Sequence, residues 1–256
     1  MPYNTYMALS WSDRHRVLYI AVFGVLALLA AVFVYDTFFV VTPTCFDAVQ
    51  NGDEHGVDCG GSCALVCTEE AHAPVVLWSR FFETGPNTYT AVAYIQNNNP
   101  SAGSKSVPYS FQIFDPDNKL VIERDGTVDL PPVQTIPIIE TNIKIANRTP
   151  AKIFFGFSVP PTWHTVASST VPKLILNHQE LSQDASRLSA TLNNFSFFNA
   201  AKVTVAAVLF DDSGTARAAS RSLVNVQQKS SVPVVFTFPG GVPGIVRAEI
   251  TVLPPF

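Results

Sequence analysis

Residues 107–115 read VPYSFQIFD, and residues 202–211 read KVTVAAVLFD. Each stretch is typical of a β-strand that runs into a turn, Pro-Asp-Asn after the first and Asp-Ser-Gly after the second. Asx and Gly residues at such positions favour hairpins. The two stretches therefore predict equivalent strands in two related parts of the chain.

The rest of both parts supports an internal repeat. Residues 78–157 align with 174–253 at a constant offset of 96, without a gap (193 − 97 = 96). A fixed offset of this kind is the mark of a repeated structural unit. The matched positions are Asn97-Asn98 with Asn193-Asn194, Phe114-Asp115 with Phe210-Asp211, Pro137 with Pro233, and Thr141 with Thr237.

Each copy contains several short strand-like segments. They read TYTAVAYIQN, IPIIETNIKI and AKIFFGFSV in the first copy, and RLSATLNN, VPVVFTF and IVRAEITVL in the second. Short strands separated by turns within about 85 residues predict a β-sandwich, and a span of that size can bury one core. Residues 161–173, rich in Ser, Thr and Pro, are expected to be a short, partly rigid linker.

The copies resemble the immunoglobulin-like sandwich family of late-embryogenesis-abundant proteins and bacterial FxLYD domains. The resemblance is carried by Phe111-Gln-Ile-Phe114-Asp115, by Val208-Leu-Phe210-Asp211-Asp-Ser-Gly214, and by the Asn pairs that close the preceding strand. Ile113-Phe114 and Leu209-Phe210 stand where that bacterial signature has Leu-Tyr. The resemblance covers roughly 160 residues and implies domains that are mostly non-enzymatic, although fold alone does not fix function.

A long apolar run precedes both copies. Val17–Tyr35 reads VLYIAVFGVLALLAAVFVY and contains no charge. As a helix it spans roughly 28 Å, close to the thickness of a bilayer's hydrocarbon core. A cleaved signal peptide would have a shorter apolar core followed by small residues. Because bulky VFVYDTFFVV follows instead, we expect a transmembrane helix that contacts the lipid bilayer through Val17–Tyr35.

The charges that flank this run predict its orientation. Arg14 and Arg16 precede it, and no Lys or Arg follows until Arg80. The positive-inside rule then places the N-terminus in the cytoplasm of a single-pass cell-membrane protein, with the C-terminal domains extracytoplasmic. The predicted segments are a cytoplasmic tail (1–16), a transmembrane helix (17–41), a Cys-rich module (42–73), a first β-sandwich (74–163) and a second β-sandwich (172–256).

The four Cys residues are clustered: Cys45, Cys59, Cys63 and Cys67. An even, clustered set outside the cytoplasm predicts two disulfides, and three pairings are open. Zinc is the alternative, but the spacing does not match the usual paired zinc knuckles.

Oxygen-bearing side chains fill the stretch between these cysteines: Asp47, Asn51, Asp53, Glu54 and Asp58. They predict either a Ca²⁺ site on a flexible loop or, more simply, turns capped by Asn, Asp and Gly. The stretch resembles a bacterial surface module with the pattern C-x-D-G-x-x-N-G-x-E-x-G-x-D-C-G-G-x-C. Ala48 stands where that pattern has Gly, so one tight turn is in doubt. The resemblance implies an extracellular setting and no defined activity.

An aromatic cluster distinguishes the second copy from the first. Phe195, Phe197 and Phe198 occupy a connection whose counterpart in the first copy is polar and small, Asn98-Asn-Pro-Ser-Ala-Gly103. The rings predict either an exposed partner-binding patch or, as the simpler alternative, a cap on the second core.

No catalytic motif stands out. The His residues are not spaced as metal ligands, and P-loop, dinucleotide and nucleophile-elbow patterns are absent from the sequence. With 14% charged residues, a net charge of −4 and no basic run, nucleic acid is not an expected partner and no cofactor other than Ca²⁺ is implied.

The sequence predicts a mainly β, non-enzymatic binding or structural protein with a protein or envelope partner. The alternatives are an accessory subunit of a larger membrane or surface assembly and a hydrolase with an unmarked site. Asn147 and Asn194 lie in glycosylation sequons.

Overall fold

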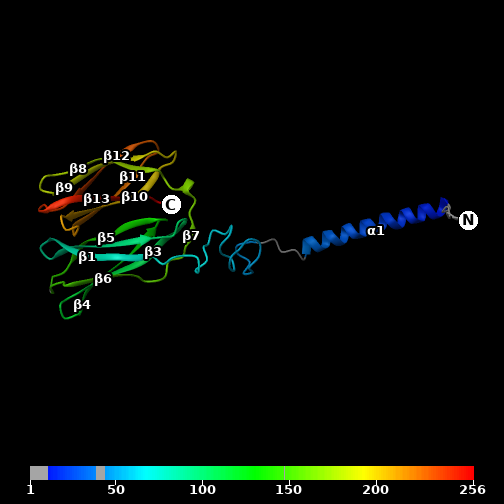
Figure 1. Ribbon diagram of the computed structural model, residues 1–256, viewed down its shortest axis with the longest axis horizontal. Coiled ribbons are helices and arrows are strands. Elements are labelled where there is room, and N and C mark those ends of the chain that lie inside the picture. Colours follow the sequence, from blue (N-terminus) through cyan, green and yellow to red (C-terminus); the bar gives the residue numbers. More distant parts are fainter. Residues whose placement is uncertain (1–10, 39–43, 147) are drawn as a thin grey trace, which may run out of the picture.

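The computed structural model describes residues 11–38, 44–146 and 148–256. The protein is mainly β, and a single long helix, α1 (Trp11–Phe38), precedes a Cys-rich module and a body of antiparallel sheets (Figure 1). An 18-residue stretch within its Arg14–Thr37 segment has a mean hydropathy of 2.9, and none of that stretch is buried. By length and composition α1 can cross a membrane, because this stretch is apolar on every face.

A three-stranded sheet and a four-stranded sheet form the first β-sandwich. One has the order β1-β2-β5 and the other β4-β3-β6, and the short β7 also pairs with β3. Phe111, Ile113 and Ile95 are fully buried between them. The strands are β1 (Val75–Gly85), β2 (Thr88–Asn97), β3 (Ala102–Phe114), β4 (Leu120–Leu130), β5 (Gln134–Lys144), β6 (Lys152–Phe157) and β7 (His164–Thr165).

The second β-sandwich repeats this arrangement. Its sheets have the orders β8-β9-β12 and β11-β10-β13, which correspond strand for strand to those of the first. The predicted tandem repeat is therefore present in the strand pairing as well as in the sequence. The elements are a 3₁₀ turn η1 (Ser168–Thr170), β8 (Leu174–Leu181), β9 (Arg187–Asn194), β10 (Ala200–Asp211), β11 (Ala216–Val226), β12 (Ser231–Thr237) and β13 (Ile245–Leu253).

The constant, gap-free offset is not kept by every strand. Ser104 pairs with Leu130, and Ala200 pairs with Val226, so β3-β4 and β10-β11 keep the offset of 96 (200 − 104 = 96 and 226 − 130 = 96). The last strand has shifted: Phe111 faces Phe155, whereas its counterpart Ala207 (207 − 111 = 96) faces Ile250, an offset of 95 (250 − 155 = 95). Connections of different length move the flanking strands, while the tight hairpin fixes the central pair.

Buried asparagines close the corner after β2 and after β9. The Asn97 amide donates to the carbonyls of Ala102 (3.0 Å) and Pro131 (2.8 Å), and its Oδ1 accepts the Asn99 N–H. Asn194 makes the same set of bonds in the second copy. Asn97 therefore corresponds to Asn194 and not to Asn193, a further shift of one residue.

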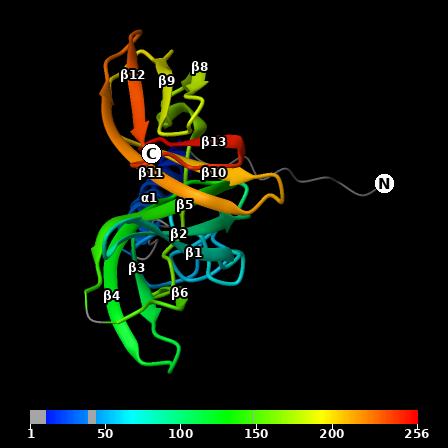
Figure 2. The same ribbon diagram turned by 90° about the vertical axis from the view of Figure 1, so that its left-hand side faces the viewer.

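The two sandwiches pack face to face through a third apolar core. Sheet β1-β2-β5 of the first lies against sheet β11-β10-β13 of the second, so the body has four layers (Figure 2). Trp78 stacks on Tyr94 with ring centroids 4.5 Å apart, and Tyr94 meets Phe210 edge-on. The buried members of this core are Val92, Tyr94, Ile139, Ala206, Val208, Phe210, Ala216 and Ala219.

The start of the predicted linker is held firmly in place. Trp163 is 5% exposed and belongs to the first core. Its carbonyl accepts the Val66 N–H at 3.0 Å, and the Thr165 N–H donates to the Ala64 carbonyl at 2.8 Å. The Cys-rich module, the linker and the first sandwich are thereby joined.

Candidate functional site

The Cys-rich module, residues 44–73, is closed by two disulfides. Cys45 pairs with Cys63 (Cα–Cα 5.6 Å), and Cys59 pairs with Cys67 (Cα–Cα 5.0 Å). The predicted oxidation is confirmed, and among the three pairings the structure has first with third and second with fourth. Because no free cysteine remains among these four, the thiolate zinc alternative is wrong.

The glycines of the module are required by close approaches. A Cβ on Gly56 would lie 2.8 Å from Cys59 Sγ, and one on Gly61 would lie 2.0 Å from the Asp53 carbonyl oxygen. Gly61 also has a φ of +58°, the left-handed region that glycine adopts at little cost. Ala48 has a φ of 59°. The turn that the Gly-to-Ala difference put in doubt is therefore formed, with a Cβ in a conformation that disfavours one.

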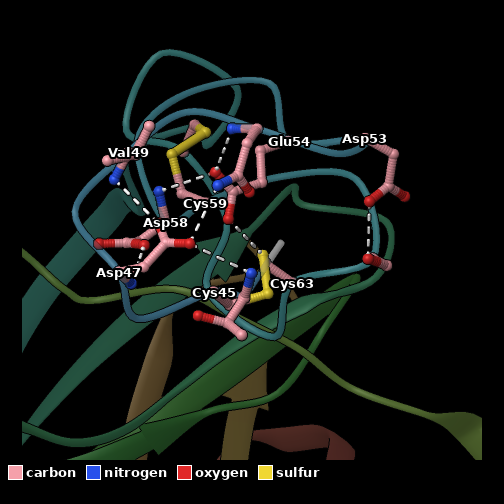
Figure 3. Close-up of a disulfide and its surroundings, with 12 residues drawn as sticks. Cys45, Asp47, Val49, Asp53, Glu54, Asp58, Cys59 and Cys63 are labelled. Atoms are coloured by element: carbon pink, nitrogen blue, oxygen red, sulfur yellow. Dashed lines mark hydrogen bonds between the residues drawn. A yellow bond between two sulfur atoms is a disulfide. The ribbon is translucent and has the colours of Figure 1, made fainter. Parts of the chain in front are cut away.

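The carboxylates of Asp58 and Glu54 bind backbone N–H groups inside the module (Figure 3). Asp58 Oδ1 accepts from Asp47 N (3.0 Å), and its Oδ2 accepts from Ala48 N (3.0 Å). Glu54 Oε2 accepts from Asn51 N (3.2 Å) and Asp58 N (3.3 Å). These bonds provide acceptors for backbone N–H groups that would otherwise lack a partner, because the module has little regular secondary structure.

Asp47 and Asp53 cap turns at opposite sides of the module (Figure 3). The Asn51 side-chain amide and the Val49 N–H lower the pKa of Asp47. The Ser62 hydroxyl, 2.8 Å from Asp53 Oδ1, lowers the pKa of Asp53. Asp53 is solvent-exposed and Asp47 is half-buried, and their hydrogen bonds match the turn-forming role.

The predicted calcium ligands are not gathered into one coordination sphere. Among the described residues, one set of three acidic, Cys or His side chains has ligand atoms within 4.8 Å of one another: Cys45, Glu54 and Cys63. Its two sulfurs form a disulfide and cannot serve as thiolate ligands. Calcium binding stays a prediction, and it would require several carboxylates to exchange internal hydrogen bonds for the ion.

The module is also fixed to the sandwich beyond the linker contacts. The His72 N–H donates to Asn99 Oδ1 at 2.7 Å, and the Asn99 amide donates back to the His72 carbonyl at 2.8 Å. Val66 and Ala71 pack against the first core. Reciprocal hydrogen bonds together with apolar contacts make the module an integral part of the folded body.

The aromatic patch, Phe195, Phe197 and Phe198, is exposed to solvent. The exposed fractions are 48%, 83% and 41%, respectively. Lys229 Nζ lies 3.9 Å from the Phe197 ring centroid and donates to the Phe195 carbonyl at 2.7 Å. The rings do not cap the second core, so the simpler of the two sequence-based alternatives is wrong. The polar counterpart in the first copy was the signal for exposure.

The acidic residues at the hairpin tips have structural partners. Asp115 Oδ1 accepts the Lys119 N–H, and Asp211 Oδ1 accepts the Thr215 N–H, each at 2.9 Å. Their predicted hairpin role is confirmed. The sequon at Asn194 is buried, with 2% exposure, so it cannot carry a glycan in the folded chain. Asn147 lies outside the described residues.

A groove that sequence reasoning missed lies between strands β1 and β6, and residues 216–217 and 242–243 of the second sandwich complete its lining. Its volume is about 730 Å³. Arg80 and Lys152 contribute two positive charges to its lining, against the carboxylate of Glu83, while the third cation, Arg217, is paired with Asp211 at 3.1 Å. The rings of Phe81, Phe82 and Phe154 supply apolar surface. We call this the edge groove, because it lies where the edges of two sheets meet.

Neither protein-family models nor curated proteins match this chain. The resemblances noted in the sequence therefore rest on the residues quoted for them, and the chain's own geometry has to carry any functional argument.

Proposed function

We propose that this protein is a membrane-anchored, extracytoplasmic and non-catalytic protein that presents its paired β-sandwiches to a protein or envelope partner. The observation that carries the proposal is the locked junction between the Cys-rich module and the body, through Val66–Trp163, Ala64–Thr165 and His72–Asn99. Such a junction transmits position and force from an anchor to a rigid head.

The anchor in this proposal is α1. The connection from Phe38 to Thr44 can reach at most about 20 Å, so a membrane-spanning α1 keeps the module close to the bilayer. Oxidised cysteines fit an extracytoplasmic location. Membership of the immunoglobulin-like family named above is part of the same proposal, supported by the six-stranded repeat.

The first experiment tests topology and anchoring. Cells carrying an N-terminal tag and a C-terminal tag are treated with external protease. After protease treatment we expect loss of the C-terminal tag and retention of the N-terminal tag. In untreated cells we expect a chain that still contains α1. Full protection of the C-terminal tag, or a mature chain that has lost α1, would refute the anchored, N-in arrangement.

The second candidate function, an accessory subunit of a larger membrane or surface assembly, is favoured by the exposed aromatic patch. Phe197 is 83% exposed, and its substitution by Ser should leave the melting temperature nearly unchanged. Copurification from detergent extracts distinguishes the candidates. A stable stoichiometric complex that Phe197→Ser and Phe198→Ser disrupt supports the subunit role, whereas unchanged recovery of partners removes the patch from consideration.

A further inference from the structure

Strand β6 is an unprotected sheet edge. Among the described residues, β3 is its one paired strand neighbour, so no strand is hydrogen-bonded along its other side. Natural proteins usually block such edges with charges, because exposed N–H and C=O groups template the pairing of another chain. β6 reads KIFFGF and has a single charge, at its first residue.

The register identifies the free backbone groups. The Ser158 N–H donates to the Pro108 carbonyl. Because hydrogen-bonded pairs alternate in an antiparallel ladder, the N–H and C=O groups of Ile153, Phe155 and Phe157 point away from β3. The Ser79 hydroxyl, 3.4 Å from the Ile153 carbonyl, reaches that outward edge.

The side chains of β6 are also only partly covered by the rest of the protein. Ile153, Phe155 and Phe157 pack against the first core but remain partly exposed, whereas Phe111 and Ile113 of neighbouring β3 are fully buried. On the outer face Phe154 is 58% exposed, and Gly156 has open space at its Cβ position. The first sandwich thus has room for one more strand beside β6.

The second sandwich shows how this edge could have been protected. Gln112 faces Phe154, and the counterpart of Gln112 is Val208 (208 − 112 = 96), which faces Glu249. Glu249 pairs with Arg247 at 2.8 Å, so the corresponding edge strand β13 carries two charges, on the face that is directed toward the first sandwich. The repeat therefore has a charged edge in one copy and an aromatic edge in the other.

The occupant's chemistry follows from the edge groove at the beginning of β6. Arg80 and Lys152, which make no ion pair within the described residues, outnumber the one carboxylate of its lining, in contrast with the net charge of −4 for the whole chain. Arg80 is exposed and makes no ion pair within the described part of the chain. An extended segment that pairs with β6 would bring its end over these cations, where an acidic side chain is attracted.

We propose that β6 and the edge groove bind an extended acidic peptide segment of another protein by β-strand addition. Main-chain hydrogen bonds to Phe155, to Phe157 and to the Ile153 N–H hold the segment, since the Ile153 carbonyl already accepts the Ser79 hydroxyl. Alternate apolar side chains of the peptide cover the partly exposed core, and a carboxylate meets Arg80 and Lys152. This site deepens the binding role proposed above and rests on it, but it does not depend on the orientation of α1.

The test uses the detergent-solubilised full chain and a phage-displayed library of linear nonamer peptides as the probe. We expect selected peptides to alternate apolar residues and to carry Asp or Glu near one end. Phe154→Glu, which copies the residue of β13, and Gly156→Lys should each weaken the best peptide by about tenfold or more, since charge on an edge opposes pairing. Arg80→Glu should weaken it similarly, and the control Arg187→Glu, at an exposed residue of β9, should not.

Backbone methylation of the best peptide distinguishes strand addition from simple apolar binding. Two versions of the peptide are compared, one N-methylated at its odd-numbered residues and one at its even-numbered residues. Because alternate N–H groups face β6, one version should lose binding and the other should keep it. Equal effects in both versions, basic consensus peptides, or affinities unchanged in Phe154→Glu and Gly156→Lys would overturn the proposal. So would a dimer of the chain that Phe154→Glu dissolves while no peptide binds, since a second copy would then be the occupant. Any of these results alongside correct membrane topology would refute this site alone.

Discussion

Ala48 occupies a backbone conformation that suits glycine. Its φ is 59°, and its N–H is held by both carboxylate oxygens of Asp58, at 3.2 and 3.0 Å. A left-handed conformation costs a residue with a Cβ roughly 1–2 kcal/mol. The hydrogen bonds that the Ala48 N–H donates to Asp58 keep the turn in place against this cost.

Ala48→Gly should therefore stabilise the module. Part of the strain relief is offset by the greater freedom of glycine in the unfolded chain, about 0.4–1 kcal/mol. We expect a net gain of about 0.5 kcal/mol, measured by non-reducing denaturation and by slower hydrogen exchange of the module amides. Ala64→Gly is the control, because Ala64 is not among the positive-φ residues. It should destabilise, and equal effects of both substitutions would contradict the strain argument.

At the scale of elements, the strand–turn units were predictable because their determinants are local. Asp115 and Asp211 cap their hairpins through residues four positions away. The exact equivalence of Asn97 with Asn194 was not predictable, because Asn193 and Asn194 are adjacent and only the buried carbonyl partners distinguish them. The exposure of β6 depends on which strands pair, and a pattern of apolar residues does not reveal an absent neighbour.

The asparagine corners should be essential to both sandwiches. Asn97→Ala leaves two buried carbonyls and one buried N–H without partners, and we expect it to cost about 1–3 kcal/mol. Asn194→Ala should cost a similar amount, since it makes the same bonds. Asn98→Ala, at an exposed neighbouring site, is the matched control and should change stability by less than about 0.5 kcal/mol. Urea unfolding measures all three, and an Asn97→Ala protein as stable as Asn98→Ala would refute the corner's role.

At the scale of the whole molecule, the sequence of β10 contains a pattern that indicates the contact between the two sandwiches. The run Ala206-Ala-Val-Leu-Phe210 is apolar on both faces of β10, as is typical of a strand buried on both sides. Val205, Ala207 and Leu209 face the second core, while Ala206, Val208 and Phe210 face the first sandwich. The choice of partner face was not predictable, because both sandwiches carry other apolar surfaces.

A charge placed in this contact should uncouple the two sandwiches. Ala219 is 5% exposed there, and Ala219→Asp would bury an unpaired carboxylate at a cost of about 3–5 kcal/mol. We expect calorimetry to show one transition for the native body and two for Ala219→Asp. The control is Leu223→Asp on the same strand, where the side chain is 67% exposed. A single, unshifted transition in Ala219→Asp would show that the contact contributes nothing.

The junction between the Cys-rich module and residues 163–166 sets an order of events during synthesis. The Val66 N–H cannot form its hydrogen bond to the Trp163 carbonyl until Trp163 has been synthesised, 97 residues later (163 − 66 = 97). At ribosomal rates the delay is about 5–20 s. Cys67, the last of the four cysteines, is translated directly after Val66, so both crosslinks have time to form in a free module. The module can dock onto the body only after the strands of the first sandwich have been synthesised, so docking follows disulfide formation and depends on a complete first sandwich.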